Sequence, residues 1–145
     1  MEKLLISACL LGERCRYDGK SNALPEPVLA ALRARYELLP VCPERDGGLP
    51  IPRVPSERRG GLVVSRAGED VTRFFERGAA AALETAKAAG CACALLKERS
   101  PSCGSGRIYD GSFTGTLVPG DGLTAEKLKA AGIAVLGESR VEELL

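Results

Sequence analysis

LLISAC, residues 4–9, is the first of three short apolar runs that lead to a cysteine; the others are ELLPVC (37–42) and CACALL (91–96), which precedes the turn SPSCG (100–104). Mostly apolar runs of this length are typical of buried parallel strands. If the three strands are neighbours in one sheet, Cys9, Cys42 and Cys103 emerge along its carboxyl edge, where open α/β sheets bind ligands. Three converging thiols in a chain without histidine indicate a soft-metal site, with iron–sulfur or zinc as the leading choices.

The remaining segments alternate with these strands in a regular order. We expect helices at residues 27–35, 70–89, 124–132 and 139–145, a fourth strand at 133–136, and long loops at 43–61 and 97–122. An alternation of strands and helices calls for an open, mostly parallel sheet with helices on both faces. The sequence therefore predicts an α/β fold, a Rossmann-like three-layer sandwich, formed as one domain over residues 1–145.

Charge and hydropathy exclude several classes of partner. Lys and Arg number 20 against 19 Asp and Glu, so the net charge is +1 and no strong field favours nucleic acid. We expect no membrane partner, because the longest apolar stretch is far shorter than the ~20 residues that span a bilayer. The N-terminus lacks the small-residue cleavage site of a signal peptide. Six cysteines then favour reduced thiols or metal ligands in the cytoplasm.

Glu44 is the first candidate for acid–base chemistry. It stands two residues after Cys42 in VCPERDGG, on a loop that begins at a strand end. A carboxylate in a partly dry site has a raised pKa and can act as a general acid or base. The chain has no histidine, so proton transfer has to use Asp, Glu, Tyr, Lys, Cys or water. The alternative is an ordinary solvated loop charge.

The turn SPSCG is the most distinctive motif. Pro101 and Gly104 favour a tight turn that gathers Ser100 and Cys103 in one cluster. Free backbone N–H groups in such a turn would stabilise the thiolate, as iron–sulfur ligands require. The alternative is a surface turn that happens to contain a cysteine.

Basic and acidic loop residues are weaker candidates for binding. Arg53, Arg58 and Arg59 lie in the proline-rich segment and could bind a phosphate or a carboxylate, although solvated loop charges are more common. Asp18 belongs to the turn RYDG and lies close in sequence to the first cysteines. We retain Asp18 and Arg53 as candidate substrate-binding residues.

Three cysteines lie outside this proposed ligand set. Cys91 and Cys93 alternate within an expected strand, so we expect both on the same face as core residues. Cys15 lies in the first loop and could be a fourth ligand or a spare thiol.

Three segments of the chain together resemble the motifs of the DUF523 family, whose characterised members are thiouracil desulfidases: SACLLGERCRYDG, PVCPERDGGLPIPRVP and LKERSPSCG. The resemblance extends from the first strand through Cys103, and the tail from Gly104 onward matches only in general character. We expect no appended second domain of the kind that some family members carry. The resemblance implies a thiolated nucleobase or nucleotide as the small-molecule substrate, with tRNA possible but not favoured.

The resemblance also implies a cofactor and roles for individual residues. A [4Fe–4S] cluster would be held by Cys9, Cys42 and Cys103, leaving one iron without a protein ligand. Glu44 and Ser100 match the family's catalytic positions, whereas the position of Cys15 often holds another residue. The implied reaction is redox-neutral: water replaces the sulfur of C=S by oxygen, and hydrosulfide is released.

Two other classes of function stay open at this point. One is a closed structural zinc site in which Cys15 completes a set of four cysteines, without catalysis. The other is a nucleotide-binding module in which glycine-rich loops and arginines hold a phosphate and the cysteines are incidental.

Overall fold

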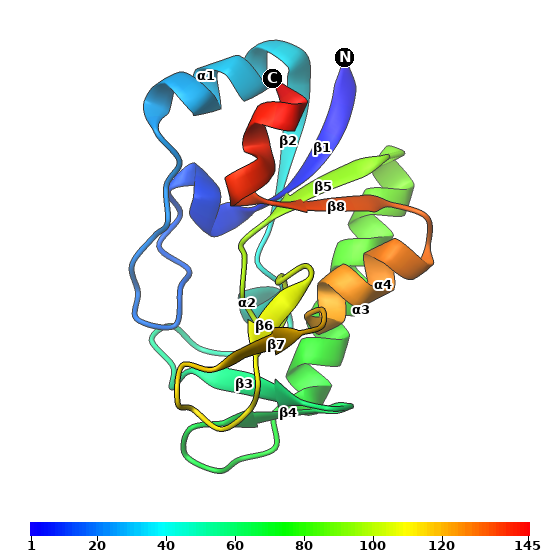
Figure 1. Cartoon of the computed structure of the whole chain (residues 1–145). Coiled ribbons are helices and arrows are strands. Elements are labelled where there is room, and N and C mark those ends of the chain that lie inside the picture. Colours follow the sequence, from blue (N-terminus) through cyan, green and yellow to red (C-terminus); the bar gives the residue numbers. More distant parts are fainter.

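The structure, a computed structural model, describes residues 1–145 and is built on a four-stranded parallel sheet (Figure 1). The strand order is β2–β1–β5–β8, with β1 at Glu2–Ser7, β2 at Tyr36–Val41, β5 at Cys93–Leu96 and β8 at Ala134–Gly137. All three pairings are parallel. The predicted α/β fold with a mostly parallel sheet and helices on both faces is confirmed.

Two helices cover each face of the sheet, and successive side chains of a strand point alternately to one face and to the other. On one face α3 (Thr72–Ala89) and α4 (Leu123–Ala130) pack over the sheet, and Leu5 joins their core cluster. On the other face α1 (Glu26–Arg35) and the 3₁₀ helix η2 (Glu138–Leu144) pack with Leu4 and Ile6. Leu4, Leu5 and Ile6 of β1 are buried on both faces of the sheet, which explains why this part of the strand is an unbroken apolar run, whereas Glu2 and Lys3 at its start are exposed.

The ends of α3 and α4 follow their local sequence signals only in part. Gly90 ends α3 in the left-handed conformation with φ of 72°, and the Asp70 carboxylate accepts a hydrogen bond from the Thr72 N–H at 3.0 Å at the other end. Thr124, the first residue of the helix expected at 124–132, is a residue type that often caps helices, but it does not cap α4. Gly122 is the capping residue, and the buried Thr124 hydroxyl instead bonds Ser102 Oγ at 2.7 Å.

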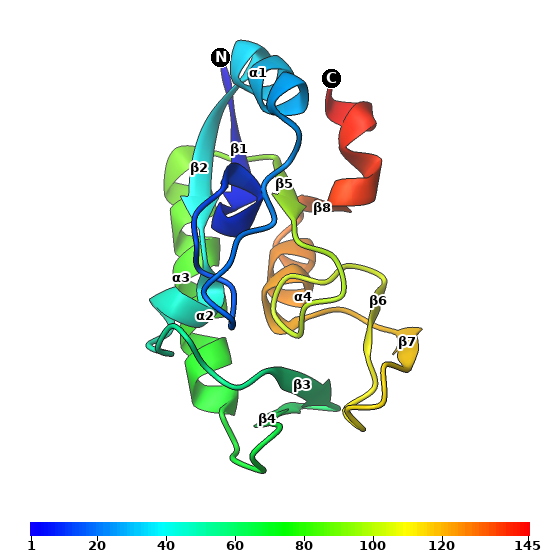
Figure 2. The ribbon, with the colours of Figure 1, turned by 90° about the vertical axis from the view of Figure 1, so that its left-hand side faces the viewer.

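Both segments expected as long loops contain regular structure. Residues 43–61 contain the short helix α2 (Pro43–Asp46) and strand β3 (Ser56–Arg59), which pairs with β4 (Leu62–Ser65). Residues 97–122 contain a second antiparallel hairpin, made of β6 (Arg107–Tyr109) and β7 (Leu117–Pro119). Figure 2 shows the two hairpins together, beyond the carboxyl ends of the parallel strands.

Cys91 and Cys93 lie on opposite faces of the sheet, so the expectation of a shared face is wrong. Strand β5 begins at Cys93, and Cys91 precedes it outside the period-two alternation. Cys91 packs in the cluster formed by α3 and α4, whereas Cys93 packs against the cluster on the other face. Both remain away from the carboxyl edge of the sheet.

The side of the sheet to which the chain adds its strands changes between β1 and β5, although all four strands run in the same direction. From β1 the chain adds β2 on one side, and β5 and β8 follow on the other side. A ligand crevice is expected at such a switch point, outside the carboxyl ends of the strands. No helix of the protein is long and apolar enough to cross a membrane.

Candidate active site and metal centre

A cavity of about 560 Å³ opens at the carboxyl edge of the sheet, and four cysteines line it. Cys9 follows β1 and Cys42 follows β2; Cys103 lies in the loop after β5. Since β2, β1 and β5 are adjacent in the sheet, the three thiols predicted from the sequence do share one site. Cys15, from the first loop, is the fourth. None of the four forms a disulfide.

Cys42 and Glu44 are positioned by the close packing of α2 on α3. A Cβ atom at Gly78 of α3 would lie 1.8 Å from the Pro43 carbonyl oxygen, and one at Gly47 would lie 2.0 Å from the Phe74 carbonyl oxygen. The two helices therefore meet backbone to backbone, with glycine on each side of the contact. Asp46 closes the turn, because its Oδ2 accepts a hydrogen bond from the Cys42 N–H at 3.0 Å.

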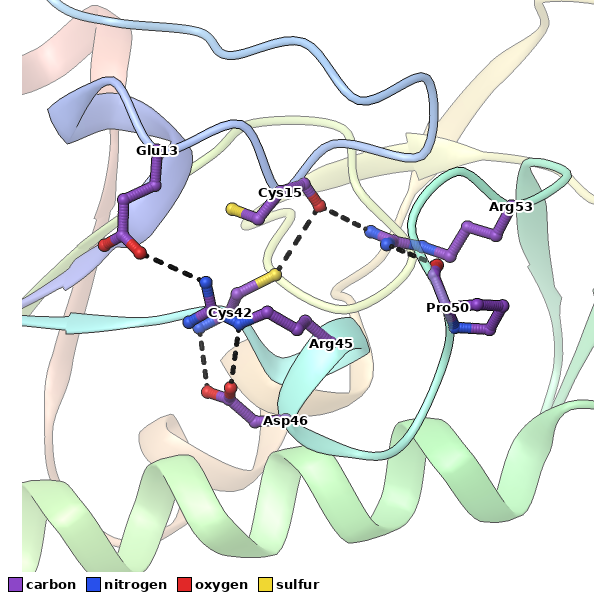
Figure 3. Close-up of polar contacts among 7 residues, drawn as sticks. All are labelled: Glu13, Cys15, Cys42, Arg45, Asp46, Pro50 and Arg53. Carbon is purple, nitrogen blue, oxygen red and sulfur yellow. Dashed lines mark hydrogen bonds and ion pairs between the residues drawn. The ribbon is translucent and has the colours of Figure 1, made fainter.

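The thiols of Cys42 and Cys15 are neighbours (Figure 3). The Cys42 Sγ lies 3.8 Å from the Cys15 carbonyl oxygen, which also accepts a hydrogen bond from Arg53 Nη2 at 2.9 Å. A hydrogen bond from the Cys15 thiol lowers the pKa of Cys42 to about 7, and the same bond raises the pKa of Cys15. Cys42 is thus the thiol of the pair that ionises first.

Burial raises the pKa values of the other two predicted ligands. The pKa of Cys103 is raised by burial, with a hydrogen bond to Ser7 acting in the opposite direction. The pKa of Cys9 is also raised by burial, and a hydrogen bond to Asn22 opposes the shift. Thiols held in this way become ligands when a metal displaces their protons.

Glu44 lines the cavity and is fixed by Arg53. Its Oε1 accepts a hydrogen bond from Arg53 Nε at 3.2 Å, and the two side chains are only 20% and 6% exposed. Burial raises the pKa of Glu44, and the neighbouring guanidinium partly offsets this effect. Of the two candidate substrate-binding residues, Arg53 therefore lies at the cavity, where it orients a carboxylate and a loop.

The SPSCG turn lies on the cavity wall, held by hydrogen bonds to its own backbone and to α4. Ser100 Oγ accepts hydrogen bonds from the N–H groups of Ser102 at 3.1 Å and Cys103 at 3.0 Å. The Gly104 N–H donates to the Ser100 carbonyl at 2.9 Å. The N–H groups expected to be free for a thiolate are thus already used at Cys103 and Gly104. The carbonyl of Ser102 accepts from the first turn of α4, which anchors the whole motif.

Asp18 and two of the arginines lie outside the cavity lining. Asp18 pairs with Arg16 at 3.0 Å and accepts from the Lys20 N–H, so it stabilises its own turn. Arg58 Nη1 donates to the Asp121 carbonyl at 2.7 Å, and Arg59 Nε donates to the Gly111 carbonyl at 2.7 Å. The geometry does not support these arginines as a phosphate site, because both bind the protein's own backbone.

Several cavity residues were not identified from the sequence. They come from strand ends, from the first loop and from both hairpin segments: Ser7, Asn22, Glu57, Arg66, Lys97, Tyr109 and Phe113. Ser7 and Lys97, at the carboxyl ends of the first and third apolar runs, carried a signal that could have been used. Glu57, Arg66, Tyr109 and Phe113 reach the site from the two hairpin segments, which the sequence pattern did not predict.

The donor set fits a multinuclear cluster better than a single ion. No group of three or more His, Cys, Asp or Glu side chains is arranged to hold one metal ion. A tetrahedral zinc site needs four donors within about 2.3 Å of one point, so the closed zinc site considered above is not supported. Iron–sulfur clusters are wider and take thiolate ligands, which matches cysteines spread around a cavity.

Comparisons with known proteins agree with this geometry. Residues 4–140 match the family described as 2-thiouracil desulfurase. The chain belongs to this family. A solved structure described as the [4Fe-4S]-dependent thiouracil desulfidase TudS, of the DUF523 group, is 51% identical with a TM-score of 0.95, over 99% of this chain and 95% of that one. An uncharacterized protein of Bacillus subtilis (strain 168), YbbK, is 40% identical over 98% of this chain and 99% of its own length. The resemblance to the DUF523 family is confirmed.

Proposed function

We propose that this protein removes sulfur from a thiolated pyrimidine, replacing C=S by C=O with water and releasing hydrosulfide without net redox change. Membership of the 2-thiouracil desulfurase family and the 51% identity to TudS support the activity. The observation that carries the proposal to this chain is the cavity in which three cysteines, each from the segment after one of three adjacent strands, meet the half-buried carboxylate of Glu44.

The proposed cofactor is a [4Fe–4S] cluster held by Cys9, Cys42 and Cys103, with one iron free of protein ligands. These residues follow three adjacent parallel strands, so a rigid sheet sets their spacing. Cys15 stays outside the ligand set in this proposal, because the matching position of the DUF523 family often holds a residue other than cysteine. When bound, the cluster supplies a Lewis-acidic iron that prefers a soft thiocarbonyl sulfur to a hard oxygen.

Glu44 is the proposed general base for the attacking water. Arg53 holds its Oε1, whereas Oε2 makes no hydrogen bond within the protein and is left for a water in the cavity. The chain has no histidine that could take this role instead. A carboxylate fixed at one oxygen presents the other in a defined direction, which is what general-base catalysis requires.

Ser100 is the proposed hydrogen-bond donor to the reacting group. Its Oγ already accepts two backbone N–H groups, so the oxygen is fixed in place. The hydroxyl proton makes no hydrogen bond to another protein atom and can be donated into the cavity that Ser100 lines. Ser100 would thereby orient either the water or the exocyclic atom of the base.

The proposed substrate is a small thiolated base or nucleotide. A net charge of +1 does not favour a long RNA, whose binding would require many phosphate contacts. Six free cysteines suit the reducing cytoplasm, which is the proposed location. We also propose that residues 1–145 act as one domain, because both hairpins help to line the cavity of the sheet.

The decisive experiment measures hydrosulfide release from thiouracil by protein reconstituted with iron and sulfide under anaerobic conditions. Iron and sulfide per chain report the cluster, and Glu44→Gln should retain it while turnover falls by roughly 10²-fold or more. Glu13→Gln is the matched control, since Glu13 pairs with Arg45 outside the cavity lining. Near-wild-type release by Glu44→Gln would remove the general-base role, and no release by the loaded wild type would remove the proposed activity.

A further inference from the structure

The tip of the β6–β7 hairpin contributes an aromatic ring, Phe113, to the wall of the cavity. Phe113 has a φ of 59°, in the left-handed region that bulky side chains rarely adopt. Residues persist in such conformations only where their surroundings hold them, and these positions cluster at ligand clamps and active sites. The structure shows what holds Phe113.

A buried carboxylate on β3 fixes the backbone of the hairpin tip. Glu57 is only 8% exposed, and its Oε1 accepts hydrogen bonds from the N–H of Gly111 at 2.9 Å and of Phe113 at 3.1 Å. A carboxylate is costly to bury unless it is hydrogen-bonded, so these two bonds account for its position. Glu57 thereby fixes the N–H of Phe113 itself.

A second contact between the same segments leaves the tip little freedom. The Gly111 carbonyl accepts from Arg59 Nε at 2.7 Å, and a Cβ atom at Gly111 would lie 2.3 Å from Arg59 Cγ. Figure 2 shows the tip of the β6–β7 hairpin reaching the end of β3. The charged residues at 57–59 therefore hold the tip of the β6–β7 hairpin in place through hydrogen bonds to its backbone.

Arg66 adds a cation above the ring. Its Cζ lies 5.7 Å from the centroid of the Phe113 ring, and both side chains line the cavity. A guanidinium over an aromatic face is attracted by the ring's quadrupole and restricts its rotation. The half-buried ring of Phe113 thus borders the cavity in a fixed orientation.

We propose that Phe113 is the surface on which the pyrimidine ring of the substrate stacks, and that Glu57 is the residue that positions it. This inference rests on the proposed function and adds to it the group that recognises the base. A pyrimidine carries no charge and presents two flat π faces, so an aromatic platform suits it better than an ion pair. The cysteine side of the cavity would engage the sulfur while the hairpin holds the ring.

Binding of thiouracil and of its product uracil to the cluster-loaded enzyme tests this role. Phe113→Leu should raise KM for thiouracil and weaken uracil binding by roughly ten-fold, because a stacked base is lost. Cluster content and kcat should stay within about two-fold of wild type, since no reacting group changes. Phe113→Tyr keeps the ring and should bind normally.

Phe113→Asn separates stacking from folding. Asparagine tolerates the left-handed conformation, so Tm should stay close to that of wild type while uracil binding weakens as much as in Phe113→Leu. Glu57→Ala should raise KM in the same way, and Glu57→Gln, which keeps an acceptor oxygen, should restore it. Wild-type KM in Phe113→Leu, or a joint loss of cluster and kcat in the Phe113 variants, would overturn the stacking role. Absence of hydrosulfide release by the wild type would instead defeat the proposed function.

Discussion

Gly78→Ala tests how strictly the site depends on the packing of α2 against α3. The new Cβ would lie 1.8 Å from the Pro43 carbonyl oxygen, 2.6 Å from its carbon and 3.0 Å from its Cα. All three are backbone atoms, so no flexible side chain can move aside. The difference between 1.8 Å and an ordinary contact of 3.4 Å means that α2 has to retreat by about 1.6 Å.

The expected result is a small loss of stability with a large loss of activity. Overpacking costs about 1–3 kcal/mol, and alanine in place of glycine within a helix returns about 1 kcal/mol, so unfolding should be easier by about 0–2 kcal/mol. A displaced α2 carries Cys42 and Glu44 with it, because they flank its first residue. A 1 Å error in catalytic geometry can cost about 10²-fold in rate.

Thermal melts, iron and sulfide content, and hydrosulfide release measured on one preparation give the three quantities needed. Gly61→Ala is the matched control, because nothing lies within 4 Å of a Cβ there and its φ lies outside the left-handed region. It should melt and react like wild type. A Gly78→Ala protein with full cluster content and wild-type turnover would refute the argument that this contact sets the position of Cys42 and Glu44.

Three further substitutions test other parts of the structure. Cys15→Ala should retain the cluster as judged by iron and sulfide per chain, and loss of the cluster would make Cys15 a ligand and contradict an iron free of protein ligands. Arg53→Lys should keep the cluster but lower hydrosulfide release by roughly ten-fold, since an ammonium cannot hold both Glu44 and the Cys15 carbonyl. Wild-type release would show that these two hydrogen bonds of the guanidinium are dispensable. Partial burial raises the pKa of Glu98, but hydrogen bonds from Ser139 outweigh it and lower that pKa below the ordinary value of 4.5. Its ionised form therefore stabilises the fold above pH 4.5 and loses that contribution as the pH falls, so the Tm gap between wild type and Glu98→Gln should shrink on acidification; a constant gap would contradict it.

Sequence predicted those parts of the fold whose signals are local. The apolar run ending at Ser7 and the stop at Gly90 each depend on a few adjacent residues, and both were placed within one or two positions. Strand β3 was missed because its sequence, SERR, is charged and only four residues long. Its Glu57 is buried because it binds N–H groups 54 and 56 residues away, and no local pattern reports such partners.

The same distinction applies to where the site residues lie. The cysteine positions followed from strand ends, since the topology of a parallel sheet brings those ends together. The arginines could not be assigned from composition, because their partners decide their roles. Arg53 reaches Glu44 and a distant carbonyl at the cavity, whereas Arg58 binds the Asp121 carbonyl, which is 63 residues away.

The structure divides the site between two kinds of support. Cys42, Cys103 and the proposed general base are carried by loops that leave the parallel sheet and pack directly on α3 and α4. The aromatic wall is carried by a hairpin that is held mainly by the charged side chains of β3. Because these supports are separate, substitutions in them should act on different quantities. Changes at α2 or at the SPSCG turn should alter iron content and turnover, whereas changes at Glu57 or Phe113 should alter the affinity for the base in a protein that keeps its cluster.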